Sequence, residues 1–496
     1  MSTNLQFKAK LNAFSSYINF CILSVLVFFI NPYLVNFLGA TNFGILKSIQ
    51  KLMDFASIAD GRSSQALKWV IANKKDLSDS EKQQAIGSSI RVLIFFSPIL
   101  LLIIGVIVFI LPYSIKSLDK DSFEIVRIAG LIGGLNIILN PLFSIPDSIL
   151  VGINEAHKST FIKTFWMVIS NISMVLVAFF GGGIVGIVSV TLCISVLIGL
   201  HTVLLCKKKI HWFGVKKPKK EQVSGFFSLS FWTLLWSFNT RLMLSSEILL
   251  LSFFIGAELV TNYTFTTYIY TFALSIALMT TSAAMPGLGN MYGNKNEKVV
   301  QKIISIVREI NLSIATLFAC LILFFNESFV TLWVGNDYYL GTGVNLLIAI
   351  LMFQLILIRN ESQIQDVSLN IRKKVLTGTL GAILGPILSI VLYMLFNNIY
   401  AIFYGLILGR IIISLGFPRM VNKQYSIISN YKNIFFSILI ISTFFILSKF
   451  VPIANSWIVL AFYSIISILV IFVLAYIFIL SSDSKKLLLG SISKRI

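Results

Sequence analysis

The chain has 496 residues, of which 57% are hydrophobic and only 12% charged, and its net charge is +20. Soluble domains carry about 25% charged residues, and no polar interval here is long enough to form a core, so the composition excludes a soluble protein. The basic residues lie in short loops between apolar runs, which indicates membrane topology and not a nucleic-acid partner.

Apolar runs recur along the whole chain. Because about 20 apolar residues cross the hydrocarbon as a helix, the pattern predicts an all-α polytopic membrane protein with about 14 transmembrane helices. These spans are expected near 17–38, 44–68, 90–111, 125–150, 161–181, 184–205, 226–253, 262–284, 305–325, 343–359, 375–396, 399–417, 434–451 and 457–480.

Basic residues alternate in density from loop to loop. Of the 40 lysines and arginines, 33 fall on the side of the two termini, six fall on the opposite side, and Arg241 lies inside a span. Because basic loops stay in the cytoplasm, we expect both termini to be cytoplasmic.

A short motif occurs twice, and the two copies suggest a duplication. Residues 37–40 read Phe-Leu-Gly-Ala after the first span, and residues 254–257 read Phe-Ile-Gly-Ala after the seventh. Two six-helix lobes in parallel repeat would enclose a central cavity, as in many transporters. The expected division is an N-terminal lobe, a basic cytoplasmic linker, a C-terminal lobe, and two extra spans with a tail, at 1–206, 207–225, 226–420 and 421–496.

The second span carries charge on one helical face. At 100° per residue, Lys47, Lys51, Asp54 and Arg62 align on that face. Charges at this depth must face water or one another. One interpretation is a structural network in which Lys51 pairs with Asp54 and Arg62 reaches the cytoplasmic interface. The other is a basic strip in which Lys47, Lys51 and Arg62 bind an anion such as a diphosphate.

Further polar residues lie within other spans. Asn136, Asn140 and Asp147 share one face of the fourth span, and Glu247 lies in the seventh. We expect these residues, with Asp54, to line a cavity and to be candidates for ion coupling. Local repair of the proline kinks in the fourth span is the alternative role for its three polar side chains.

The eighth span begins with hydroxyl and aromatic residues. Thr267, Tyr268 and Thr271 occupy the positions that match the charged face of the second span, and Trp236 lies in the seventh. Hydroxyls and aromatic rings suit sugars, so these four residues are candidate glycan ligands. An interfacial aromatic belt is the alternative.

Signs of catalysis are lacking. The three histidines are isolated, and no metal-ligand cluster, nucleophile constellation or phosphate-binding glycine loop is visible. We therefore expect neither a cofactor nor enzyme activity.

Several loose motifs are similar to those of one transporter superfamily. They are Phe37–Gly44, Asp60–Arg62, Ile255–Glu258 with Tyr263, and Leu332–Gly335. With the span count, they make the chain resemble the multidrug/oligosaccharidyl-lipid/polysaccharide (MOP) flippase superfamily, and within it the polysaccharide branch of Wzx-type O-antigen and capsule repeat-unit flippases. Glu247 departs from the Asp that many members of that superfamily carry there.

The resemblance implies a substrate and partners. The substrate is an undecaprenyl-diphosphate-linked oligosaccharide, moved by alternating access from the cytoplasmic to the outer leaflet. Such a role would serve O-antigen, lipopolysaccharide or capsule synthesis. It would place the protein in the bacterial inner (plasma) membrane, among membrane lipids, with a polysaccharide polymerase and a chain-length regulator as further partners.

Two other functions fit the same superfamily. A lipid II flippase of peptidoglycan synthesis also handles a polyprenyl diphosphate. A drug or cation antiporter would want carboxylates in the first lobe, but the first span has no acid and the second is basic.

Orientation can be tested by labelling single cysteines in intact cells. We expect positions 217 and 373 to be protected from a membrane-impermeant thiol reagent, and positions 119, 337 and 455 to react with it, because basic loops remain inside. Labelling of position 217 from outside would contradict the orientation.

Overall fold

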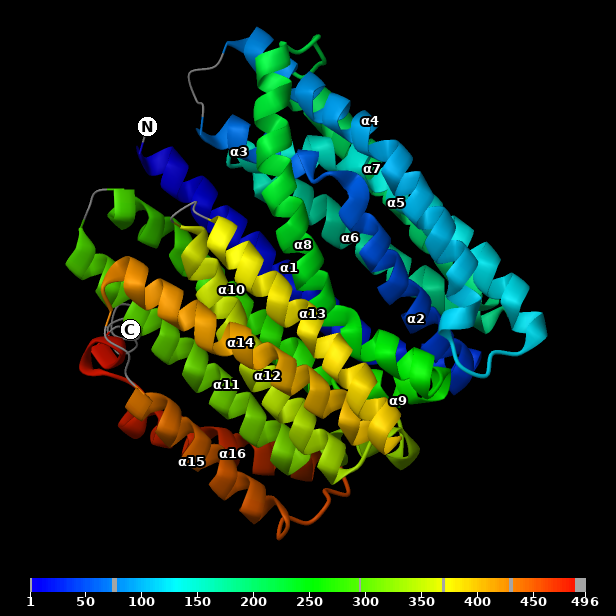
Figure 1. Ribbon diagram of the computed structural model, residues 1–496, viewed down its shortest axis with the longest axis vertical. Helices are drawn as coiled ribbons and strands as arrows, with labels where there is room; N and C mark the ends of the chain where they lie inside the picture. Colours follow the sequence, from blue (N-terminus) through cyan, green and yellow to red (C-terminus); the bar gives the residue numbers. More distant parts are fainter. Residues whose placement is uncertain (1, 74–77, 294–295, 368–370, 428–430, 487–496) are drawn as a thin grey trace. The chain divides into compact units, whose positions relative to one another are not determined.

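The computed structural model describes residues 2–73, 78–293, 296–367, 371–427 and 431–486, and within these residues every regular element is a helix (Figure 1). The α-helices are α1 (Ser2–Leu38), α2 (Ala40–Ala56), α3 (Ser63–Asn73), α4 (Asp79–Ile110), α5 (Lys120–Gly152), α6 (Ala156–Phe179), α7 (Gly183–Lys209), α8 (Lys220–Phe254), α9 (Ala257–Thr266), α10 (Tyr268–Gly293), α11 (Glu297–Trp333), α12 (Thr342–Asp366), α13 (Ile371–Phe396), α14 (Ile399–Tyr425), α15 (Tyr431–Ser448) and α16 (Trp457–Phe478). Three short 3-10 helices complete the order: η1 (Ser57–Asp60), η2 (Leu111–Ser114) and η3 (Asn336–Tyr338).

The prediction of an all-α polytopic membrane protein is confirmed. In the described residues, 12 helical segments are long and apolar enough to cross a membrane. The two other expected spans fall on α8, which is 35 residues long and contains Arg241 and Glu247, and on the α2–α3 segment. Neither is counted among the 12 segments. α8 contains charged residues within its apolar part, and the α2–α3 segment is not one continuous helix.

The continuous helix expected over 44–68 is wrong in one detail. α2 ends at Ala56 after 17 residues, and η1 follows it. Gly61 and Arg62 then adopt φ values of 69° and 48°, in the left-handed region that favours glycine. A Cβ at Gly61 would lie 2.5 Å from the Phe96 ring. Helical periodicity therefore does not carry through the break, and Arg62 does not share the face of α2.

The first of two compact units, Met1–Thr261, contains α1 to α8 and the start of α9. α5 packs against α3, α4 and α7, α1 packs against α6, and α2 packs against α5 and α8. The unit ends at Thr261 because α8 packs with α2, α3 and α4. The lobe boundaries expected from the sequence stay a prediction.

The two copies of the repeated motif meet inside this unit. The Thr261 hydroxyl donates a 2.6 Å hydrogen bond to the Ala40 carbonyl, and a Cβ on Gly44 would lie 1.8 Å from the Ala257 carbonyl oxygen. Under the repeat, Ala40 corresponds to Ala257 and Gly44 to Thr261. The contacts are therefore reciprocal, as expected when two copies meet about a two-fold axis.

The second unit, Asn262–Ile496, is organised around α11. This helix packs against α10, α12, α15 and α16, and Figure 1 shows α15 and α16 side by side. α13 and α14 cross closely, since a Cβ on Gly409 would lie 2.3 Å from the Gly385 nitrogen, and one on Gly405 would lie 2.2 Å from the Ser389 nitrogen. Small residues are the usual means by which helices approach in lipid.

Gly44→Ala is expected to destabilise the protein, because the added methyl would collide with the Ala257 backbone. Overpacking of this kind costs about 1–3 kcal/mol. The measurement is the Tm of the purified protein in detergent. Gly105→Ala in α4 is the matched control, since its Cβ would meet nothing within 4 Å. Equal Tm values for the two variants would contradict the close crossing.

Candidate functional site

The charged face of α2 is accessible, and its apolar face is buried. Ile45 and Ile49 are each 1% exposed, whereas Lys47, Lys51 and Asp54 are partly exposed. This separation is the amphipathic pattern of a helix with one face in the core. Because charge against lipid is costly, the accessible face is best suited to a hydrated space.

The partner of Asp54 is Arg241 of α8, at 3.2 Å between Oδ2 and Nη1. The interpretation in which Asp54 pairs with Lys51 is therefore wrong. No role for Arg241 had been inferred from the sequence, although an arginine within a span calls for an anionic partner and Asp54 was an available acid.

The two lysines of this face keep their charge uncompensated. The Lys47 Nζ lies 4.8 Å from the centre of the Phe43 ring. Within the described parts of the chain, neither Lys47 nor Lys51 forms an ion pair. They stand four residues apart on one helix, where like charges repel. An anion placed between them would relieve that repulsion.

Arg62 lies beyond the break and is held locally. Its backbone N–H donates to Asp60 Oδ1 at 2.8 Å, and its Nε lies 3.7 Å from the same oxygen. The structure therefore separates Arg62 from the strip of the two lysines, and Asp60 largely compensates its charge.

The polar residues of α5 have different environments. Asn136 Oδ1 is buried and accepts no hydrogen bond from the described residues, and Asn140 is exposed. Asp147 forms a 2.7 Å ion pair with Lys163 of α6. On α8, Glu247 is only 2% exposed and Trp236 is half-buried.

The candidate glycan ligands of the second unit use their hydroxyls locally. Thr267 donates to the Tyr263 carbonyl at 2.6 Å and is buried, and Thr271 donates to the Tyr268 carbonyl at 2.8 Å. The Tyr268 ring lies 4.6 Å from the Trp333 ring between centroids. These contacts favour the aromatic-belt alternative for Thr267 and Tyr268, and Thr271 remains exposed.

The start of α1 is fastened to the turn between α5 and α6. Glu155 accepts hydrogen bonds from Lys8 at 2.7 Å and from Lys158 at 2.5 Å. Burial works to raise the pKa of Glu155, but the hydrogen bonds and positive charges of the two lysines outweigh it and lower the pKa. These cations are thus neutralised, unlike those of α2.

The second unit contains a partly buried ion pair that was not predicted from the sequence. Arg308 of α11 contacts both carboxylate oxygens of Glu361 in α12, at 2.7 and 2.6 Å, and donates to the Asn422 side chain of α14 at 2.7 Å. Lys374 likewise pairs with Asp366. The signal was present, since an arginine and a glutamate at neighbouring ends of two expected spans can satisfy each other by pairing.

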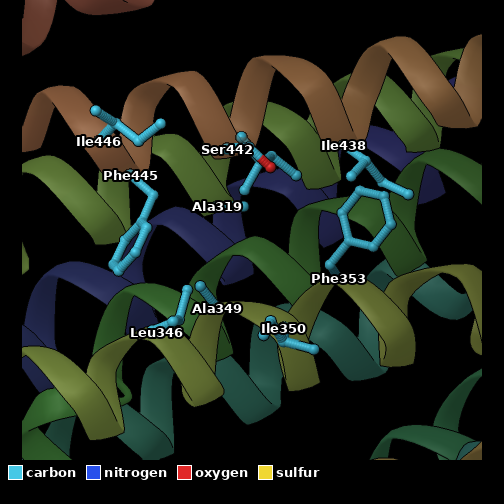
Figure 2. A pocket seen from close by; sticks show the side chains of 10 residues that line it. Ala319, Leu346, Ala349, Ile350, Phe353, Ile438, Ser442, Phe445 and Ile446 are labelled. Atoms are coloured by element: carbon cyan, nitrogen blue, oxygen red, sulfur yellow. The ribbon is translucent and has the colours of Figure 1, made fainter.

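An apolar cavity of about 500 Å³ lies among α11, α12 and α15 in the second unit (Figure 2). Its lining includes Phe353, Phe445 and Ile446, and Ser442 supplies its one side-chain oxygen. Such a lining fits hydrocarbon and not a sugar or a phosphate.

The fold is that of the MOP transporters. The chain is similar to a lipid II flippase MurJ structure in an inward closed conformation, with 16% identity, 94% of this chain and 97% of that chain covered, and a TM-score of 0.65. It is similar to an inward-facing multidrug resistance MATE transporter, with 14% identity, coverages of 81% and 94%, and a TM-score of 0.62. A MOP superfamily transporter from Pyrococcus furiosus also matches, with 14% identity, coverages of 86% and 95%, and a TM-score of 0.55.

The family follows from the sequence. The model of the polysaccharide biosynthesis protein family matches residues 11–292, and the chain belongs to that family. Among curated proteins, none matches the chain significantly. The predicted membership of the polysaccharide branch of the MOP superfamily is confirmed.

Glu361→Gln is expected to lower stability by about 1.5–3 kcal/mol, because it leaves the partly buried Arg308 without its counter-charge. The measurement is the Tm of the purified protein. Asp483→Asn is the matched control. It removes an ion pair with Lys302, which lies in α11 as Arg308 does, and both side chains of that pair are about half exposed. Such exposed pairs contribute about 0–1 kcal/mol. A smaller loss of Tm for Glu361→Gln than for Asp483→Asn would contradict a stabilising role of the Arg308–Glu361 pair.

Proposed function

We propose that the protein is a flippase that moves an undecaprenyl-diphosphate-linked oligosaccharide from the cytoplasmic to the outer leaflet of the plasma membrane by alternating access. One observation carries the proposal. Lys47 and Lys51 are partly exposed on α2 and form no ion pair within the described residues, while Asp54 is paired with Arg241. The face is therefore net cationic and suits a diphosphate, whose attraction to lysine grows as water is excluded.

The other parts of such a substrate have matching chemistry in the chain. The apolar cavity of the second unit fits a polyprenyl chain. The exposed hydroxyl of Thr271 and the half-buried Trp236 suit a glycan. The family's role in polysaccharide biosynthesis supports an oligosaccharide as cargo. The reaction is movement without bond changes, so no catalytic residue or cofactor is assigned.

A lipid II flippase is the second candidate, because the MurJ fold covers 94% of this chain and lipid II presents the same diphosphate. A cation antiporter fits less well, since a cationic drug would be repelled by the strip on α2. Complementation separates the first two. The protein should restore surface polysaccharide when its gene is returned to a strain from which that gene has been deleted. It should not rescue a strain that has lost its lipid II flippase.

The double variant Lys47→Ala, Lys51→Ala should lower surface glycan by about tenfold or more, since each charged contact contributes about 1.5–3 kcal/mol. Surface glycan is measured in a complemented deletion strain and normalised to membrane-inserted protein. Lys302→Gln, which removes an exposed cation elsewhere, is the control and should behave as wild type. Full transport by the double variant would remove the strip from the mechanism.

A further inference from the structure

Four charged side chains meet where α2 breaks. Arg241 of α8 pairs with Asp54 in the last turn of α2, at 3.2 Å. Arg62 contacts Asp60 just beyond the break, and the positive charge of Arg241 also acts on Asp60. Each of the two acids therefore has an arginine beside it, and the Asp54–Arg241 pair ties α2 to α8.

The Asp54–Arg241 pair is open to competition. The two side chains are 38% and 33% exposed, and Arg241 Nη1 lies 3.2 Å from Asp54 Oδ2. A guanidinium has five N–H donors in a planar fork and can bind phosphate through two of them at once. A phosphate that reaches the partly exposed Arg241 can therefore compete with Asp54 for these donors.

The cluster lies next to the two unpaired lysines. Lys51 precedes Asp54 by three residues and Lys47 precedes it by seven, so all three share one face. At 1.5 Å per residue they stand about 4.5 and 10.5 Å from Asp54 along the helix axis. A diphosphate bound between the lysines is within short reach of Arg241.

We propose that Arg241 is a further substrate-binding residue and that Asp54 is an internal anion that occupies it when no substrate is present. This rests on the proposed function. The incoming diphosphate displaces Asp54 from Arg241 and so breaks the ion pair between α2 and α8. The positive φ values at Gly61 and Arg62 mark the point at which α2 can then change direction. Substrate binding is thereby linked to movement of α2.

The test is the affinity of purified protein for undecaprenyl diphosphate, measured as ligand-dependent thermal stabilisation. Competition predicts effects of opposite sign. Asp54→Asn removes the competing anion and should tighten binding about tenfold, whereas Arg241→Gln should weaken it about tenfold, consistent with the size of charged hydrogen bonds. Arg241→Lys should fall between Arg241→Gln and wild type, because lysine keeps the charge without the fork. Lys302→Gln is the control and should bind as wild type.

A purely structural ion pair gives a different pattern. Asp54→Asn and Arg241→Gln would then both lose thermal stability, and the affinity for undecaprenyl diphosphate would be unchanged in both or reduced in both. Either of these affinity results would overturn the proposed displacement of Asp54 by the diphosphate. The swapped variant Asp54→Arg, Arg241→Asp guards against misfolding. It should regain thermal stability but bind undecaprenyl diphosphate less well than wild type, and wild-type binding by the swapped protein also overturns the proposal.

The outcomes separate the exchange from the proposed function. If wild type binds undecaprenyl diphosphate and Lys47→Ala, Lys51→Ala weakens that binding, while Asp54→Asn does not tighten it, the exchange alone fails. If wild type does not bind undecaprenyl diphosphate at all, the proposed function fails. Transport supplies a further readout, since Asp54→Asn should bind tightly yet lower surface glycan by removing the anion that drives release.

Discussion

A charge within the thickness of a bilayer has to be paired or hydrated, and the interior of this protein is arranged around that constraint. In the second unit, Arg308 and Glu361 satisfy each other completely in a bidentate contact that a third helix supports through Asn422. In the first unit, Lys47 and Lys51 lie on a partly exposed face and form no ion pair in the part of the chain that the structure describes. The first arrangement stabilises a helix bundle, and the second provides attraction for an anion.

Close backbone contact is the second means of holding the helices together. Lipid chains compete with apolar side chains for apolar surface, so association depends on packing and on small residues. The Gly44 crossing and the glycines of α13 and α14 serve this purpose. At the first of these, two copies of a repeated motif also contact each other reciprocally. α2 thus packs tightly against the start of α9 near its own first residues, and it forms a partly exposed ion pair with α8 near its last turn.

The interruption of α2 changes how its charges are interpreted. A continuous helix would place Arg62 with the lysines as a third ligand. Because of the break, Arg62 pairs with Asp60, and the arginine that pairs with Asp54 beside the two lysines is Arg241 of α8. The number of positive charges near the strip is unchanged, but one of them now belongs to a different helix. Binding at such a site acts on two helices at once, which a site on α2 alone would not do.

The sequence by itself determined the membrane class, the positions of most spans, the repeat and the amphipathic face of α2. These follow from local composition and periodicity, because crossing hydrocarbon requires about 20 apolar residues in a row. Only the tertiary structure decided that Asp54 pairs with Arg241 and not with Lys51, that Thr267 uses its hydroxyl on its own backbone, and that Arg308 braces three helices. Ion pairs and hydrogen bonds join positions far apart in the chain, so their partners depend on helix packing and on the break at Gly61, where a left-handed backbone ends the periodicity on which the sequence argument relied.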